Sequence, residues 1–292
     1  MHSSSHERRV MRRYPVSQRC LLGLSVLAIA SSVAPSFAQE SDWRFMAAPY
    51  AWAFGLEGDI GIGDRVASVD ESFLDIMDQS DSIVALQGHA EVRYRRIGAF
   101  LDGAYADITY SPGASAERRF FDAEVDTDID EQILLVEAGG FYRVLEDRRL
   151  WGDPAADGGG LLNADILLGA RYTRLDIEVD AELTVNQQEF EVDFEGDRDW
   201  VDPFIGVRTS LRLTEAIDLS LRGDVGGVVT GSDFSWNTQA LLGYRFALFG
   251  APATAWGGYR ALGQDYDDSS GDREFTWDVV LHGPIIGMSV TW

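Results

Sequence analysis

Charged side chains recur at alternate positions along several apolar segments of this 292-residue chain. Acidic and basic members of this set nearly balance, so their simplest chemistry is mutual: each carboxylate accepts hydrogen bonds from a guanidinium, which removes the cost of an unpaired buried charge. Alternatively, the same charges line a narrow pore and select solutes. The set comprises Glu91, Arg93, Arg95, Glu137, Arg143, Asp165, Arg171, Asp202, Arg208, Arg212, Asp218, Arg222, Asp224, Arg245 and Arg260.

A second group of carboxylates occupies alternate positions over 122–130, 176–182 and 189–195. The simpler interpretation is a solvated acidic surface. Because Ca²⁺ and Mg²⁺ favour carboxylate oxygens, these residues could instead share divalent cations with the phosphates of lipopolysaccharide. The candidate ligands are Asp126, Asp128, Glu178, Asp180, Glu191 and Asp193. Apart from such surface Ca or Mg, no cofactor is predicted.

Nucleophilic catalysis has few candidate residues. Beyond residue 38 the histidines are His89 and His282. His89 shares a strand face with Glu91, which could orient an imidazole, but no serine is tied to it by sequence. The chain also has no Gly-rich phosphate loop and no His cluster with metal-ligand spacing. We therefore predict that the protein is not an enzyme. A lipid-modifying hydrolase is kept as an alternative and ranks last among the candidate functions.

The first 38 residues have the composition of an export signal. Five arginines precede the apolar run "LLGLSVLAIA", and "SFA" follows at 36–38. This order predicts a secretory signal peptide over 1–38, cleaved after Ala38, which leaves 39–292 as the mature chain. Its removal takes away five Arg, one Glu and Cys20, so the net charge falls to −28 and no disulfide can form. So acidic a chain excludes nucleic acid as a partner.

Strict alternation of apolar and polar residues dominates the mature chain. In 162–173, for example, the even positions run from Leu162 to Tyr172 and are apolar, whereas Asn163, Asp165 and Arg171 share the other face. A soluble sandwich also alternates. Here, however, the polar faces pair Arg with Asp or Glu among Gly and Ser, and aromatic residues edge the apolar faces. The pattern predicts an all-β fold, a single antiparallel transmembrane β-barrel in the outer membrane.

Turn signals divide the chain into about ten spanning strands. They cover 42–56, 82–96, 97–110, 130–145, 161–175, 199–213, 216–230, 233–247, 252–264 and 274–292. Short turns alternate with long acidic connections, as in barrels with periplasmic turns and extracellular loops. An extra hairpin over 58–69 would leave eight or twelve strands open, and "SFLDIMD" at 72–78 could form a helical turn or two.

Three neighbouring segments change polarity along one face. In "EFEVDFEGDRDWVDPFIGVRTSLRL" (189–213), alternate residues from Glu189 are acidic, whereas alternate residues from Val201 are nearly all apolar. The segments 122–144 and 162–182 change in the same way when the same parity is followed. Because water surrounds a strand outside the bilayer, we predict that these strands continue as an extracellular β extension with an acidic exterior and an apolar interior.

Several segments resemble a family of largely uncharacterised Gram-negative outer-membrane β-barrel proteins. They include "APYAWAFGLEGDIGIG", "AEVRYRRIGAFLDGAY", "DWVDPFIGVR", "LRGDVGG", "GSDFSWNTQALLGYRF" and "GGYRALGQDY", and the resemblance covers nearly all of the mature chain. It implies location and architecture, and it assigns no catalytic residue. The ending "GPIIGMSVTW" looks like the C-terminal signal read by the barrel-assembly machinery, with Trp in place of the usual Phe.

These observations predict a non-enzymatic integral outer-membrane β-barrel protein with a structural or surface role. Its expected partners are outer-membrane lipid, lipopolysaccharide and the assembly machinery. The alternative is a small-solute, porin-like channel. A ten-stranded barrel is only slightly wider than one filled by its own side chains, so any channel would be narrow.

Overall fold

The computed structural model describes residues 42–62, 65–110, 114–118, 121–151, 160–185, 188–228, 230–268 and 275–292. Within these ranges, the side chains of 62, 65, 114–118, 121–129, 179–185 and 188–195 are not described. The signal peptide predicted over 1–38 lies outside the described residues. In the described ranges, no α-helix has both the length and the apolar composition needed to cross a bilayer.

The described chain consists of thirteen β-strands and one short helix. They are β1 (Trp43–Trp52), β2 (Gly55–Ile62), β3 (Arg65–Glu71), α1 (Phe73–Gln79), β4 (Ser80–Tyr94), β5 (Ile97–Tyr110), β6 (Ala114–Arg118), β7 (Phe121–Arg149), β8 (Leu161–Val185), β9 (Gln188–Arg212), β10 (Ile217–Gly226), β11 (Phe234–Leu248), β12 (Ala251–Asp268) and β13 (Phe275–Thr291).

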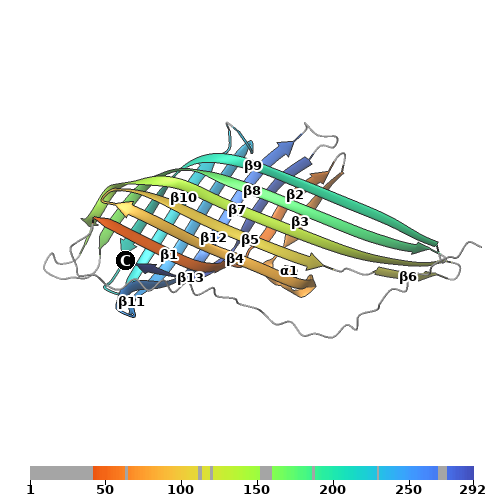
Figure 1. The fold of residues 1–292 in the computed structure, drawn as a ribbon, viewed down its shortest axis with the longest axis horizontal. Helices are drawn as coiled ribbons and strands as arrows, with labels where there is room; N and C mark the ends of the chain where they lie inside the picture. The colour runs from red at the N-terminus through yellow and green to blue at the C-terminus, as the bar shows by residue number, and fades with distance from the viewer. Residues whose placement is uncertain are drawn as a thin grey trace, which may run out of the picture. The chain divides into compact units, whose positions relative to one another are not determined.

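Ten antiparallel strands close into a barrel. Figure 1 shows its ribbon. Their order around the ring is β1, β4, β5, β7, β8, β9, β10, β11, β12 and β13, and β13 pairs again with β1. The last residue takes part in closure, because Trp292 N–H donates to Phe45 O at 3.0 Å and Phe45 N–H donates to Trp292 O at 2.9 Å. A closed ring leaves no unpaired strand edge facing lipid. The predicted ten-stranded transmembrane barrel is confirmed.

The hairpin anticipated at 58–69 is present as β2 and β3, but it does not enlarge the ring. β2 pairs with the N-terminal half of β13, from Phe275 to His282, whereas β1 pairs with its C-terminal half, from Ile285 to Thr291. The hairpin therefore extends the wall above β1. Its outer face is polar, with Ser68 Oγ donating to Asp59 at 2.6 Å.

The helix predicted near 72–78 is α1, and it begins with a capping box. Ser72 Oγ accepts from the Asp75 N–H at 3.3 Å, and Asp75 Oδ2 accepts from the Ser72 N–H at 3.1 Å. These reciprocal bonds satisfy two backbone donors that a helix start leaves free. The hydrogen bonds from Ser72 also lower the pKa of Asp75. α1 inserts Ile76 into the apolar interior of the barrel's outer half.

The alternation predicted along the spanning strands sets which side chains face lipid. On β8, Leu168 is 68% exposed, whereas its neighbour Leu167 is 1% exposed and packs inside against Phe204. Ile205 and Val207 on β9 face outward in the same way. Arg95 departs from the prediction. It does not point into the lumen but occupies the β4–β5 turn with φ 54°, and its Nε donates to Asp42 at 2.9 Å.

Three strands run well beyond the others. β7, β8 and β9 are 29, 25 and 25 residues long and form the projecting part of Figure 1. Along them Arg174 and Asp199 are the first polar outward residues, and the outward face is polar on all three strands at the row Gln132–Asp176–Asp197, which we take as the end of their membrane-spanning part. The inward face stays mostly apolar, since Ile133 and Leu175 are each 2% exposed, with Glu131 and Arg198 as exceptions. The predicted inversion of polarity therefore holds where side chains are described.

An arginine at the lipid-facing position Leu168 should weaken the barrel. Leu168→Arg places a cation near the middle of the apolar band, where the cost is about 2–4 kcal/mol. Denaturant unfolding of the protein refolded in lipid vesicles measures this loss. The matched control is Val66→Arg on β3, because Val66 is 64% exposed beyond the apolar band. Equal stability of both variants and the unmodified chain would show that the lipid-facing side of β8 is wrongly assigned.

Candidate functional site

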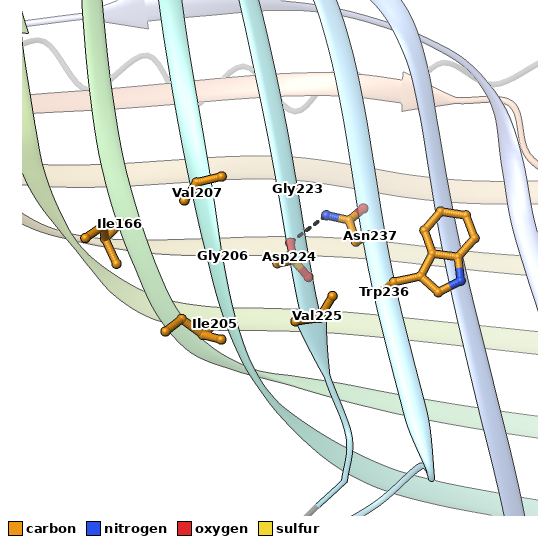
Figure 2. A pocket seen from close by; sticks show the side chains of 9 residues that line it. All are labelled: Ile166, Ile205, Gly206, Val207, Gly223, Asp224, Val225, Trp236 and Asn237. Atoms are coloured by element: carbon orange, nitrogen blue, oxygen red, sulfur yellow. Dashed lines mark hydrogen bonds between the residues drawn. The ribbon is translucent and has the colours of Figure 1, made fainter.

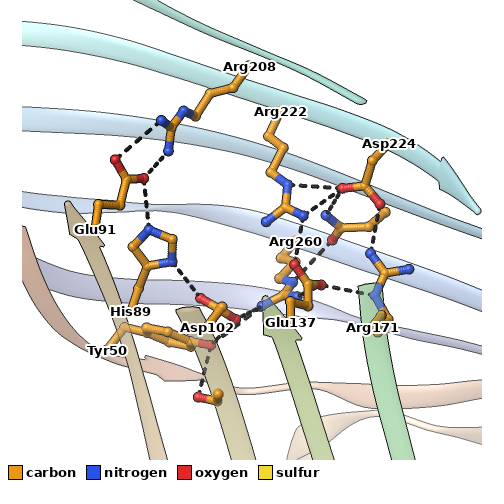
Figure 3. Close-up of polar contacts among 12 residues, drawn as sticks. Tyr50, His89, Glu91, Asp102, Glu137, Arg171, Arg208, Arg222, Asp224 and Arg260 are labelled. Carbon is orange, nitrogen blue, oxygen red and sulfur yellow. Dashed lines mark hydrogen bonds and ion pairs between the residues drawn. The ribbon is translucent and has the colours of Figure 1, made fainter. Parts of the chain in front are cut away.

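A buried carboxylate, Glu137 on β7, forms the centre of a charge network in the lumen (Figure 3). It is 1% exposed and accepts hydrogen bonds from three arginines on three other strands. Arg171 Nε and Arg260 Nη2 each donate to Glu137 Oε1 at 2.9 Å, and Arg222 Nη2 donates to Oε2 at 2.6 Å. So many charge-assisted bonds compensate the desolvation of a single carboxylate and fix its position.

Asp224 on β10 holds two of these arginines, Arg171 and Arg222, from a second side. Its carboxylate accepts from Arg171 Nη2 at 2.7 Å and from Arg222 Nε at 2.9 Å. Asn237 Nδ2 also donates to it at 2.9 Å, while the amide oxygen of Asn237 accepts from Arg260 Nε at 3.1 Å. Asn237 thus links Asp224 to Arg260, which have no direct contact with each other.

Arg260 and His89 extend the network toward the opposite wall. Arg260 Nη1 donates to Asp102 at 3.2 Å, and Tyr50 Oη donates to the same carboxylate at 2.9 Å. His89 Nδ1 lies 3.0 Å from Asp102 Oδ2, and its Nε2 lies 2.9 Å from Glu91 Oε1. Since both ring nitrogens face acceptor-only carboxylates, the geometry fits an imidazolium that donates at both ends.

Glu91 connects His89 to a second group of ion pairs. Arg208 forks onto Glu91 and also donates through Nη2 to Asp165 at 3.0 Å. Arg143 Nε completes the group by donating to Asp165 at 2.8 Å. A continuous path of polar contacts therefore runs from Arg143 to Asn237.

The network crosses the lumen and is nearly neutral. Among the described residues it joins five arginines, five carboxylates and His89. Its partners come from opposite sides of the ring: Glu137 on β7 meets Arg260 on β12, and Glu91 on β4 meets Arg208 on β9. Aromatic rings cover guanidiniums of the network. The Cζ atom of Arg260 lies 4.7 Å from the centre of the Trp52 ring, and that of Arg208 lies 4.9 Å from the centre of the Phe141 ring. These contacts bridge the lumen from one wall of the barrel to the other.

Most of the charged residues predicted to face the lumen enter this network. They are Glu91, Glu137, Arg143, Asp165, Arg171, Arg208, Arg222, Asp224 and Arg260. Four others lie apart, near the end with the short turns: Arg93 pairs with Glu146 at 3.3 Å, and Asp218 lies 3.6 Å from Arg245 and 3.9 Å from Arg212.

Asp202 faces inward as predicted but forms no ion pair with an arginine among the described residues. Its carboxylate accepts from Ser232 N–H at 2.8 Å, from Ser232 Oγ at 2.6 Å and from Gln264 Nε2 at 3.2 Å. It therefore ties the loop between β10 and β11 to the barrel wall. Asp202 belongs to a loop anchor and not to the arginine network.

Three members of the network escaped the sequence-based prediction. Asp102 lies on the inward parity of β5, which alternation along 97–110 could have identified. Tyr50 and Asn237 are uncharged, so no charge pattern marks them. The network partners of His89 also come from two strands, β4 and β5, and only the strand register His89↔Asp102 reveals this.

The candidate cation ligands lie on the extension. The strand register places Asp128 opposite Asp180, and Asp180 opposite Asp193, while Asp126 and Glu191 both pair with Glu182. Glu178 is exposed. The side chains of the other five candidates lie outside the described residues. Where side chains are described, no three His, Cys, Asp or Glu residues are arranged to hold a metal ion.

Glu131 lies inside the extension, one row beyond the end of the membrane-spanning part of β7. Its strand neighbours are Ile108 and Ile177, and no described side chain donates a hydrogen bond to it. Burial among these apolar groups raises the pKa of Glu131 to about 7. Burial, together with the carboxylates of Glu131 and Glu71, likewise raises the pKa of Tyr110.

No protein-family model and no curated protein matches this chain. Among solved structures, the attachment invasion locus protein Ail of Yersinia pestis shares 12% identity over 86% of this chain and 99% of Ail, with a TM-score of 0.27. Ail in complex with the heparin analogue sucrose octasulfate gives 11% identity, the same 86%, 98% of Ail and a TM-score of 0.29. A Pseudomonas aeruginosa FadL homologue gives 6% identity over 86% of this chain and 90% of the homologue, with a TM-score of 0.25.

The chain itself has the features that place a protein in the outer membrane. Its closed ring of antiparallel strands has an apolar, lipid-facing exterior and a charged interior. The protein is an outer-membrane β-barrel.

Removing one guanidinium from the network should destabilise the barrel strongly. Arg260→Met leaves Glu137 and Asp102 short of compensation in a buried site, a loss of about 3–5 kcal/mol. Denaturant unfolding in vesicles measures it. Arg174→Met is the control, because Arg174 pairs with Asp176 on the outer face and is half exposed. An Arg260→Met protein as stable as this control would mean that the network does not hold the strands together.

Glu131 should make the barrel less stable as pH rises from about 4.5 to 7. Its pKa is higher in the folded state than in the unfolded state, so the folded chain holds the proton more tightly and stability falls across this window. The loss is up to about 3 kcal/mol, at about 1.4 kcal/mol per pKa unit. Unfolding measured at several pH values should show a shallower decline for Glu131→Gln. Identical pH profiles for the two proteins would contradict the assignment.

Proposed function

We propose that this protein is a non-enzymatic outer-membrane barrel with a closed lumen and a structural or surface role. One observation carries the proposal: the ion pairs join opposite walls of the ring in a single cross-section, from β7 to β12 and from β4 to β9. Charged side chains that bind one another in this way are not free to select a solute.

The exterior supports a surface role. The projecting strands β7, β8 and β9 present Asp130, Asp176 and Asp197 outward, beyond the apolar band. An acidic, hydrated surface of this kind remains soluble and repels anionic molecules. Lipopolysaccharide with its bound divalent cations is the neighbour we propose for it.

Assembly is proposed to proceed through the C-terminal strand. β13 closes the barrel on β1, and Trp292 stacks on Phe45 with ring centres 6.4 Å apart. Because this strand must be placed last against the first, its exposed aromatic end suits recognition by the barrel-assembly machinery.

Deletion of a charge-balanced bridge should open the lumen. Glu91→Ala combined with Arg208→Ala removes one acid and one base, so the net charge is kept while the link between β4 and β9 is lost. Planar-bilayer recordings should show no discrete conductance steps for the unmodified protein and reproducible steps for this double variant.

The matched control is Arg174→Ala with Asp176→Ala, which deletes an ion pair on the outer face. Heat-modifiable migration on a gel first establishes that each variant is folded. Discrete steps from the unmodified protein would favour the second candidate function, a narrow solute channel.

A further inference from the structure

The lipid-facing wall contains an apolar groove across β8, β9, β10 and β11 (Figure 2). Its volume is about 570 Å³. Its sides and ends are formed by the outward residues Ile166, Ile205, Val207, Val225 and Trp236. The floor is the backbone around Gly206, Gly223, Asp224 and Asn237.

The outward Gly223 leaves the hollow of the groove, and the backbone of the inward Gly206 lies in its floor. A Cβ on Gly206 would lie 2.5 Å from the Cβ of Asp224, so Gly206 is required for the close approach of β9 to β10 beside the charge network. Gly223 faces outward, and a Cβ there would meet nothing within 4 Å. Because the flanking Val207 and Val225 project into lipid, the missing side chain at Gly223 leaves a hollow between them.

The groove lies within the membrane-spanning part of the wall, toward its extracellular side. Gly223 shares a row with Val207 and Ile166, and the next row outward contains Ile205, Val225 and Trp236. The polar row of Arg174 and Asp199 lies farther out. Trp236, two residues from the start of β11, is of the type enriched at the membrane–water boundary. The groove therefore lies in the hydrocarbon region on β8 and β9 and reaches toward Trp236 near the outer end of β11.

We propose that this groove binds one acyl chain of an outer-leaflet lipid. The occupant must be apolar and narrow, because nearly every lining side chain is apolar and the hollow is about one missing side chain wide. An apolar site of this kind holds no ordered water. A second copy of the barrel would need a complementary patch of about 800 Å² per partner, whereas the groove is concave and continuous with the lipid-facing band. The inference does not depend on the closed lumen.

Photocrosslinking with a lipid tests the proposal directly. The refolded protein is placed in vesicles of phosphatidylethanolamine that carries a diazirine on its acyl chain, and labelled residues are mapped by mass spectrometry. Labelling should concentrate on the groove-lining residues of β9, β10 and β11. In the Gly223→Leu variant the leucine side chain fills the hollow. Labelling of the groove-lining residues should then fall roughly tenfold, which corresponds to a tenfold weaker binding constant.

Gly103→Leu provides the matched control. Gly103 is an outward glycine on β5 and also has nothing within 4 Å of its Cβ position, so the same substitution leaves the groove intact. Labelling of the groove should be unchanged in this variant. If Gly223→Leu does not fold, Gly223→Ala gives a smaller change in the same direction. Uniform labelling around the barrel, unchanged labelling in the Gly223 variants, or crosslinks to a second copy would overturn the proposal.

Discussion

The charge of Glu137 is the constraint on which the interior depends. A carboxylate that is almost completely buried cannot stay ionised unless several donors surround it, and here three arginines from β8, β10 and β12 do so. Each arginine is a further buried charge that needs its own acids, which Asp224 and Asp102 supply. The network is therefore cooperative, because every member compensates a cost created by another.

The same network governs how the barrel wall is built. Residues that face inward must be small where guanidiniums and carboxylates crowd together, and Gly206 beside Asp224 is one result. Gly223, the outward residue next to Asp224 on β10, leaves the exterior hollow at the same place.

The membrane imposes the second constraint, and it acts strand by strand. Inside the bilayer the outer face must be apolar, and beyond it the outer face must be hydrated. β8 obeys both rules along one continuous strand, with Leu168 outward in lipid and Asp176 outward in water. Its inward face changes in the opposite sense, from Arg171 within the charge network to Leu175 in an apolar interior.

The sequence by itself determined the fold class, a number of strands of about ten and the side of the wall on which most residues lie. These follow from a local rule, because side chains alternate between the two faces of a strand whatever its neighbours are. Tertiary structure alone decided the pairing: Arg260 meets Glu137, 123 residues away, and recruits the uncharged Asn237. It also placed β2 on β13 and left Asp202 with a loop serine. Such contacts depend on the stagger with which the ring closes, and no local pattern along the chain records that stagger.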